Sequence, residues 1–508
     1  MRADFLERFA SEFRGGFARL LEQGAVFTDG HQDHALTVTA AGHATIATGV
    51  YPARHGIVGN DFYDRASGRS MYCAEDSTAA ILGFPDDPGR SPANLLRRTV
   101  GDWLKIAWPE SKVYGVAIKD RAAIISSGES ADGAYWYHLE TGRFVTSAYY
   151  ESDYPEWVDA FNRDRPASAY YGQEWTKLLG DEHYAASRED AFDAEFDGEN
   201  TTFPHRAGSG VGTPDALFFQ MLPFTPFAEE LTVEFANELV VREELGVDEA
   251  PDILFLGLSS ADYIGHAYGP YSQEIEDYYL RVDQHLEAFF GFLDEHVGPD
   301  HYVVVLSSDH GVMAMPEELQ RRGHDAGRFD PQPLNQMARQ IVEEAVVESL
   351  VPTMPRLLPV NGLALGFSDP LPPPESVTAL RRRIAERVEA HELVERVFTF
   401  DELAAAEIHG NDVVGRFRRS FHPDRSPDLA LHYKENYLAF PQATFTSHGS
   451  AHRYDTHVPI VFMGPGVRAG RHERRVRTVD IAPTLAMLLG ISAPDDLDGE
   501  ALAEATEQ

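Results

Sequence analysis

Short apolar runs alternate along the chain with amphipathic helical patterns. Four of these runs read as buried strands that end at polar residues, namely residues 112–121, 252–262, 302–311 and 458–466. Residues 272–296 carry apolar side chains at three- and four-residue spacing, which predicts a long amphipathic helix. Strands that alternate with helices predict an α/β fold, in which a mainly parallel sheet is covered on both faces.

A helical pattern also begins almost at the first residue. Phe5, Phe9, Phe13 and Phe17 recur at four-residue intervals, so one face of this segment is apolar. The first 30 residues carry Arg and Glu throughout and lack the apolar stretch of a signal peptide. An export signal, if the protein has one, is therefore expected upstream of Met1.

Two regions interrupt the alternation of strands and helices. Residues 130–230 are rich in Tyr, Trp, Asp and Gly, and AYWYHLETGRFVTSAYY within them predicts a hairpin. Residues 320–445 contain the Pro-rich stretch LPPPES and the helix-forming stretch SVTALRRRIAERVEAHE. Because 508 residues exceed the usual size of one domain, we expect either two domains or one large α/β core with insertions. We interpret the chain as a single domain over residues 1–508, with both regions as insertions above the functional edge of the sheet.

Composition excludes some classes of function. The chain has 81 Asp and Glu residues against 43 Lys and Arg, a net charge of -38, which argues against binding to the backbone of nucleic acids. Cys73 is the only cysteine, so the chain forms no intramolecular disulfide. No apolar stretch approaches the roughly 18 to 20 residues of a transmembrane span. The sequence makes no prediction of oligomeric state.

Aspartates and histidines follow several of the predicted strands. SSADYIGH supplies Asp262 and His266, VLSSDHGV supplies Asp309 and His310, and FTSHGS supplies His448. Ligands gather beyond the carboxyl ends of parallel strands, and carboxylate with neutral imidazole suits zinc. Each motif alone also fits a tight turn or a helix cap. Two strand-terminal sets with a further downstream histidine together predict a metal centre.

Thr39 is the candidate nucleophile. It stands before AAGHATIATG, a small-residue helix start where free backbone N–H groups and the helix dipole would stabilise an anion. A threonine hydroxyl becomes a good nucleophile only when a metal or base lowers its pKa. The alternative for Thr39 is an ordinary helix cap, and the alternative for Asn60 in GIVGNDFYD is a turn residue.

Lys119 and Arg121 in AIKDRAAI follow another predicted strand. Their one-residue separation directs both side chains to the same side if the strand continues through them. An ammonium and a guanidinium that converge can hold the oxygens of a phosphoryl group, although a solvated surface pair is the alternative.

In order and spacing, these motifs resemble those of the alkaline phosphatase superfamily, most closely its PafA-like phosphate monoesterase branch near the nucleotide pyrophosphatase/phosphodiesterases. The resemblance extends over essentially the whole chain and includes TVTAAGHATIATGVYPARHGIVGNDFYD, KDRAAI, AYWYHLETGRFVTSAYY, SSADYIGHAYGP, SSDHGV, SHGSAHRYDTHVPI and VDIAPTLAMLLGI. It implies an alkaline phosphatase-like three-layer sandwich and hydrolysis of small-molecule phosphate esters.

The resemblance also implies two Zn²⁺ ions and a role for each candidate residue. One ion would be bound by Asp262, His266 and His448, and the other by Asp309 and His310 beside Thr39. His457 in DTHVP is a rival to His448. Thr39 would attack phosphorus in line and form a phosphothreonine intermediate, while Lys119, Arg121 and Asn60 would contact the phosphoryl oxygens.

The paired cations favour monoesters over diesters, because a monoester dianion carries more charge for them to compensate. The resemblance implies that diesterases of the superfamily lack this pair, so phosphodiester or nucleotide pyrophosphate hydrolysis is the alternative activity. A sulfatase fits less well, because those enzymes need a C-x-P-x-R or S-x-P-x-R motif and Cys73 lies in MYCAED.

One departure from the family pattern concerns the second zinc site. Family members begin with an apolar strand that ends in a zinc-binding aspartate, shortly before a Met-Arg pair like Met1-Arg2. This sequence has no such strand, and Asp4 falls within the predicted helix. We therefore expect Met1 to be an internal methionine or a truncation, and the second zinc site to be impaired. An inactive scaffold is then a further alternative, and an upstream export signal would imply a periplasmic or secreted location.

Overall fold

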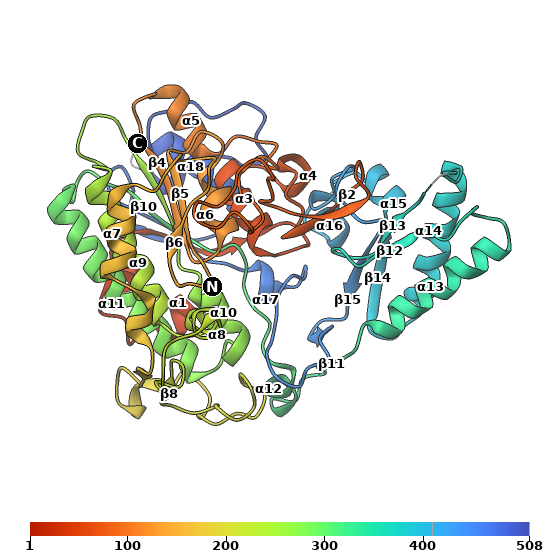
Figure 1. The fold of residues 1–508 in the computed structure, drawn as a ribbon, viewed down its shortest axis with the longest axis horizontal. Coiled ribbons are helices and arrows are strands. Elements are labelled where there is room, and N and C mark those ends of the chain that lie inside the picture. Colours follow the sequence, from red (N-terminus) through yellow and green to blue (C-terminus); the bar gives the residue numbers. More distant parts are fainter. Residues whose placement is uncertain (369, 409, 507–508) are drawn as a thin grey trace.

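The computed structural model describes residues 1–368, 370–408 and 410–506, and two four-stranded ladders form its centre (Figure 1). One ladder has the order β6 (Phe144–Val145), β5 (Gly133–Tyr137), β4 (Val113–Ala117), β9 (Ile253–Gly257). The other has the order β10 (Val304–Ser307), β17 (Ile460–Met463), β1 (Ala25–His31), β18 (Gly470–Arg477). Each of the four predicted apolar runs contains a strand, namely β4, β9, β10 or β17, whereas β1 was not predicted.

Parallel and antiparallel pairs both occur. β5 and β9 run parallel to β4, and β18 runs parallel to β1, but β17 runs antiparallel to β1 and to β10. The α/β class predicted from the sequence is confirmed. The hairpin predicted in AYWYHLETGRFVTSAYY is the antiparallel β5–β6 pair. Because β5 also pairs with β4, the start of the expected insertion 130–230 contributes a strand to the main ladder.

The alternation of side chains along β5 explains the layers. Tyr135 and Tyr137 belong to a core shared with α9 (Phe227–Arg242) and α11 (Gln273–His296), whereas Ala134 and Trp136 belong to a core shared with α6 (Asp120–Ser127). Successive side chains of a strand point to opposite faces, so this ladder lies between two helical layers. The long helix predicted over residues 272–296 is α11.

The amino-terminal apolar face is present, but it is divided between two helices. All four phenylalanines are buried in the same core, while residues 9–15 separate α1 (Phe5–Arg8) from α2 (Gly16–Gln23). A Cβ atom on Gly16 would lie 2.2 Å from the Cβ of Leu286 on α11, so this close approach requires glycine. The Asp283 carboxylate accepts hydrogen bonds from the N–H groups of Gly15 and Phe17 at 2.7 Å, which caps α2.

The described residues between 332 and 433 form a lobe beside the main body in Figure 1, and many of them share a separate core. There α13 (Gln332–Val347) and α14 (Pro374–Val388) contribute to one core with the antiparallel pair β14 (Val394–Thr399) and β15 (Leu429–Tyr433). Among the described residues, no helix combines the length and apolar character needed to cross a membrane.

β9 and β10 each lie at one end of a ladder, and the chain that follows each of them enters one polar region. Each has a ladder partner along one edge only among the described strands, and their residues are half-buried, whereas those of β4 and β17 are buried. α10 (Ser260–Tyr268) follows β9, and Asp309 follows β10. The carboxyl ends of these strands therefore place chemically active side chains near one another.

Candidate active site

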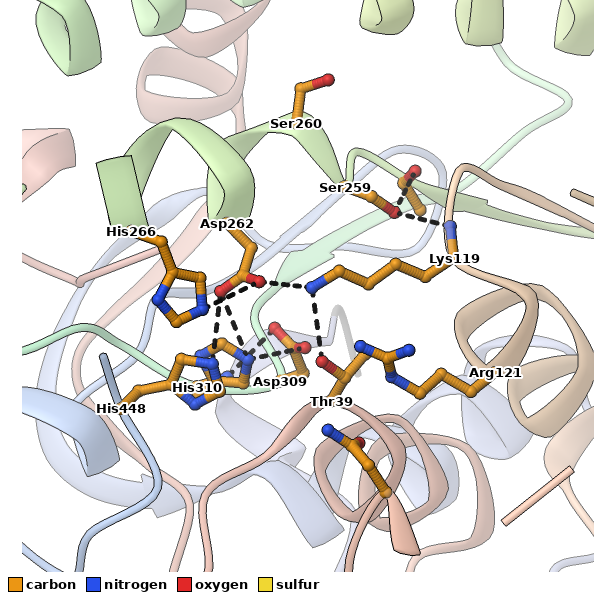
Figure 2. A network of polar contacts seen from close by, with 12 residues as sticks. Thr39, Lys119, Arg121, Ser259, Ser260, Asp262, His266, Asp309, His310 and His448 are labelled. Carbon is orange, nitrogen blue, oxygen red and sulfur yellow. Dashed lines mark hydrogen bonds and ion pairs between the residues drawn. The ribbon is translucent and has the colours of Figure 1, made fainter. Parts of the chain in front are cut away.

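Three segments that are distant in the sequence bring aspartates and histidines together (Figure 2). Asp262 and His266 lie one turn apart on α10, Asp309 and His310 follow β10, and His448 comes from the loop before α17 (Arg453–Thr456). Nε2 of His266 and Nε2 of His448 each lie 3.4 Å from an oxygen of Asp262. Nε2 of His310 lies 3.2 Å from Oδ2 of Asp309, and its ring stacks on that of His448 with centroids 3.5 Å apart.

The three imidazole rings are oriented in the same way by backbone carbonyls. In each ring Nδ1 is the donor, from His266 to Thr446 O at 2.6 Å, from His448 to Thr37 O at 2.8 Å, and from His310 to Gly311 O at 2.8 Å. Since a carbonyl only accepts, Nε2 carries the lone pair of each neutral ring. Nε2 of His310 is buried without a hydrogen-bond partner.

This donor set fits a divalent metal. Ligand atoms of Asp262, His310 and His448 all lie within 4.8 Å of one another. Carboxylate oxygen with imidazole nitrogen is the ligand chemistry of zinc, and the carbonyls bonded to Nδ1 are the outer partners that orient metal-binding histidines.

The carboxylates of the cluster are held in their ionised form. Although burial opposes ionisation, the Lys119 ammonium and the neighbouring imidazoles hold the pKa of Asp262 well below its usual range. Burial also opposes the ionisation of Asp309, but the His310 imidazole holds the pKa of that carboxyl well below its usual range. The Met1 α-amino group also lies here, and it donates to Ser308 Oγ at 2.6 Å and His310 O at 3.0 Å. The region therefore combines partly buried carboxylates with several positive or neutral nitrogen groups.

Thr39 is the first residue of α3 (Thr39–Thr48), whose N-cap residue is Val38. The side chain of Val38 makes no hydrogen bond to the helix. Instead, Oδ1 of Asn60 accepts a hydrogen bond from the N–H of Ala40 at 3.0 Å. Thr39 is therefore not the cap residue of α3, whereas Asn60 lies in a bend, as its turn alternative expects, and its side chain also caps the start of α3. A Cβ atom on Gly42 would lie 2.3 Å from Asp309 O, so glycine at this position lets α3 approach the cluster.

Lys119 and Arg121 do not continue a strand. β4 ends at Ala117, Lys119 is the N-cap residue of α6, and Arg121 lies in the first turn of that helix. The strand was expected to direct both side chains to the same side, and it ends before them. Both side chains nevertheless extend toward Thr39 (Figure 2). Lys119 Nζ lies 3.4 Å from Thr39 Oγ1 and pairs with Asp262. Nη1 of Arg121 donates to Tyr72 at 3.4 Å, while its Nε is buried without a partner.

Two further histidines complete the comparison with the sequence. His457 lies in a different cluster, with Asp29 and His31, so the geometry favours His448 beside Asp262. His43 was not predicted from the sequence, yet its Nε2 lies 3.7 Å from Oδ2 of Asp309. Its position four residues after Thr39, on the same face of a helix, is the signal that would have identified it.

Comparison with known proteins agrees with this geometry. A model of the family "Type I phosphodiesterase / nucleotide pyrophosphatase" matches residues 1–455. The chain is 33% identical over 513 residues to alkaline phosphatase PafA of Elizabethkingia meningoseptica, covering 99% of this chain and 92% of that protein. It is 34% identical over 520 residues to a protein named calcium-transporting ATPase from Myroides odoratus, covering 100% and 93%. The crystal structure of PafA superposes with a TM-score of 0.88 at 32% identity, covering 100% of this chain and 97% of that one.

Glu229 on α9 supports the helix that carries Asp262 and His266. Its Oε2 accepts from the N–H of Ser260 at 2.9 Å and from the Tyr278 hydroxyl at 2.8 Å. Burial raises the pKa of Glu229 to about 7, although both hydrogen bonds act in the opposite direction. The carboxyl group is therefore near its point of ionisation at neutral pH.

We expect Glu229→Gln to stabilise the protein at high pH. In the unfolded chain this group titrates near 4.5, so the folded state binds the proton more tightly and the free energy of unfolding falls as pH rises from 4.5 to 7. Gln retains an oxygen acceptor without titrating, so the variant should gain about 2 kcal/mol relative to the unaltered protein between pH 5 and pH 8. Urea unfolding at both pH values measures the difference. Glu295→Gln on the exposed face of α11 is the control, and an equal effect of Glu229→Gln at both pH values would contradict the expectation.

Proposed function

We propose that this chain, which belongs to the type I phosphodiesterase/nucleotide pyrophosphatase family, hydrolyses phosphate monoesters of small molecules through a phosphothreonine intermediate on Thr39. The observation that carries the proposal is the Thr39 hydroxyl at the start of α3, with the Lys119 ammonium 3.4 Å away. The similarity of this chain to alkaline phosphatase PafA over 99% of its length supports monoester hydrolysis.

The side chains of the site divide the reaction between them. Oγ1 of Thr39 would form a bond to phosphorus while the bond from phosphorus to the ester oxygen breaks, and the departing alcohol takes up a proton. Water would then attack the phosphothreonine, release inorganic phosphate and restore the hydroxyl. The start of α3 favours the negative charge that develops near Thr39.

Three side chains would hold the phosphoryl oxygens during both steps. Lys119 and Arg121 supply two positive charges, and the buried Nε of Arg121 is an unused donor in the described structure. Because the N–H of Ala40 occupies Oδ1 of Asn60, the amide nitrogen of Asn60 is the group that it can offer. Two cations compensate a monoester dianion better than a diester monoanion, which supports the monoester preference.

We propose Zn²⁺ as the metal, held by Asp262, His266 and His448 at one site and by Asp309, His310 and Thr39 at a second. When bound, Zn²⁺ supplies Lewis acidity that lowers the pKa of a hydroxyl group and stabilises a departing oxygen.

Thr39→Ala should abolish hydrolysis, whereas Thr39→Ser should retain part of it, because serine keeps a hydroxyl group at the same position. We expect a loss of about a thousandfold or more for the alanine variant on an aryl phosphate. Mass spectrometry of acid-quenched protein should find phosphate on residue 39 in the unaltered chain and not in Thr39→Ala. If the unaltered chain has no activity at all, the inactive scaffold is the correct alternative.

Lys119→Ala and Arg121→Ala should impair monoester hydrolysis more than diester hydrolysis. Each variant removes one charge that faces the additional negative oxygen of a monoester, so kcat/KM should fall about 100-fold or more on an aryl phosphate. The loss on the matching aryl phosphodiester should be several-fold smaller. Equal losses on both substrates would refute this assignment and favour the diesterase alternative.

The two proposed zinc sites can be tested by metal analysis of dialysed protein. Asp262→Asn and Asp309→Asn should each remove about one Zn²⁺ per chain relative to the unaltered polypeptide, because each deletes a charged ligand of a different site. Unchanged zinc content in both variants would refute the proposed sites.

A further inference from the structure

A second group of metal-binding side chains lies outside the active site. Asp29 and His31 stand at the end of β1, and His457 follows α17. The backbones of His31 and His457 form an antiparallel bridge, and their rings stack with centroids 4.9 Å apart. One ligand atom from each of the three residues lies within 4.8 Å of the other two. None of the three residues has a role in the hydrolysis proposed above.

The hydrogen bonds of this cluster leave imidazole lone pairs available. Nε2 of His457 donates to Thr28 O at 2.9 Å, so Nδ1 carries the lone pair of its neutral ring. His31 is 1% exposed, its Nε2 lies 2.8 Å from Oδ1 of Asp29, and its Nδ1 is buried without a partner. Burial lowers the pKa of His31 to about 4 and also lowers that of His457, so both rings are neutral at neutral pH. Neutral imidazole is the form that binds metals.

The cations that face the cluster do not block it permanently. Nη1 of Arg453 lies 3.4 Å from Oδ1 of Asp29 and 3.4 Å from Nε2 of His31, and the Arg453 side chain is 62% exposed. A long exposed side chain can turn toward solvent at little cost. Arg475 is engaged by Oδ1 of Asp33 at 2.5 Å. Arg453 therefore competes with a metal ion for the Asp29 carboxylate.

We propose that Asp29, His31 and His457 bind one Zn²⁺ that links β1 to the segment that includes α17 and follows the His448 loop. Two imidazoles and a carboxylate are a ligand set that suits zinc, with a further position open to water. Backbone bonds already join the two segments, from Val458 N to Gly30 O at 3.0 Å and from Gln32 N to Thr456 O at 2.8 Å. Oδ2 of Asp455, in the same segment, holds the N–H and hydroxyl of Ser450 in the His448 loop. The ion would therefore act as a structural clip.

The test uses the full chain with the active-site ligands removed by Asp262→Asn and Asp309→Asn. In this background, equilibrium dialysis against Zn²⁺ should find about one ion per chain. The addition of His457→Ala or Asp29→Asn should weaken this binding by about 10-fold or more, because one of three protein ligands is lost. Arg453→Ala should instead tighten it, because the competing guanidinium is removed. Zn²⁺ should raise the melting temperature of the background chain and not that of the His457→Ala chain.

His472→Ala is the matched control, because His472 lies on the neighbouring strand β18 with Nε2 also unpartnered but belongs to neither ligand group. It should leave Zn²⁺ binding unchanged. In the chain with an intact active site, retained hydrolysis by His457→Ala reports correct folding. The proposal is overturned if the background chain binds no Zn²⁺ at micromolar concentrations, or if Asp29→Asn and His457→Ala bind it as the background does. Either result is independent of the proposed hydrolysis, because the background lacks that site.

Discussion

The partly buried carboxylate of Asp262 is the interaction on which the arrangement of the active site depends. Removing an anion from water is costly unless charged and polar partners surround it, and here they come from four parts of the chain. Lys119 arrives from the turn after β4, His266 from the same helix, His448 from the loop before α17 and His310 from the end of β10. Removing the charge would leave these groups with no common partner.

The scaffold brings these partners close by means of its strand ends and two close backbone approaches. β4 and β9 are neighbours in one ladder, while β10 is at the end of the other, and all three lead into the site. Gly42 allows α3 to contact the backbone of Asp309, and Gly16 allows α2 to contact α11. A side chain at Gly42 would move Thr39 away from the carboxylates, which links a packing constraint to the chemistry.

The two histidine clusters illustrate how similar residues acquire different roles. His448 and His457 are nine residues apart, and each ring donates to a backbone carbonyl between residues 28 and 37. The acceptor of His448 is Thr37, two residues before the candidate nucleophile, whereas the acceptor of His457 is Thr28 within the strand. The difference in acceptor places one ring beside Asp262 and the other beside Asp29.

Local pattern in the sequence was sufficient to predict the strands β4, β9, β10 and β17, the helix α11, and the residue types expected of a metal and phosphate site. These features depend on apolar runs, helical periodicity and short motifs, which neighbouring residues determine. β1 escaped prediction because only AVF of AVFTDGH is apolar, and its burial comes from β17 and β18, more than 400 residues away. The break between α1 and α2 likewise depends on Asp283 and Leu286 of α11. The capping role of Asn60, the position of His43 and the choice between His448 and His457 were decided only by the tertiary structure, because each depends on contacts between segments that are distant in the sequence.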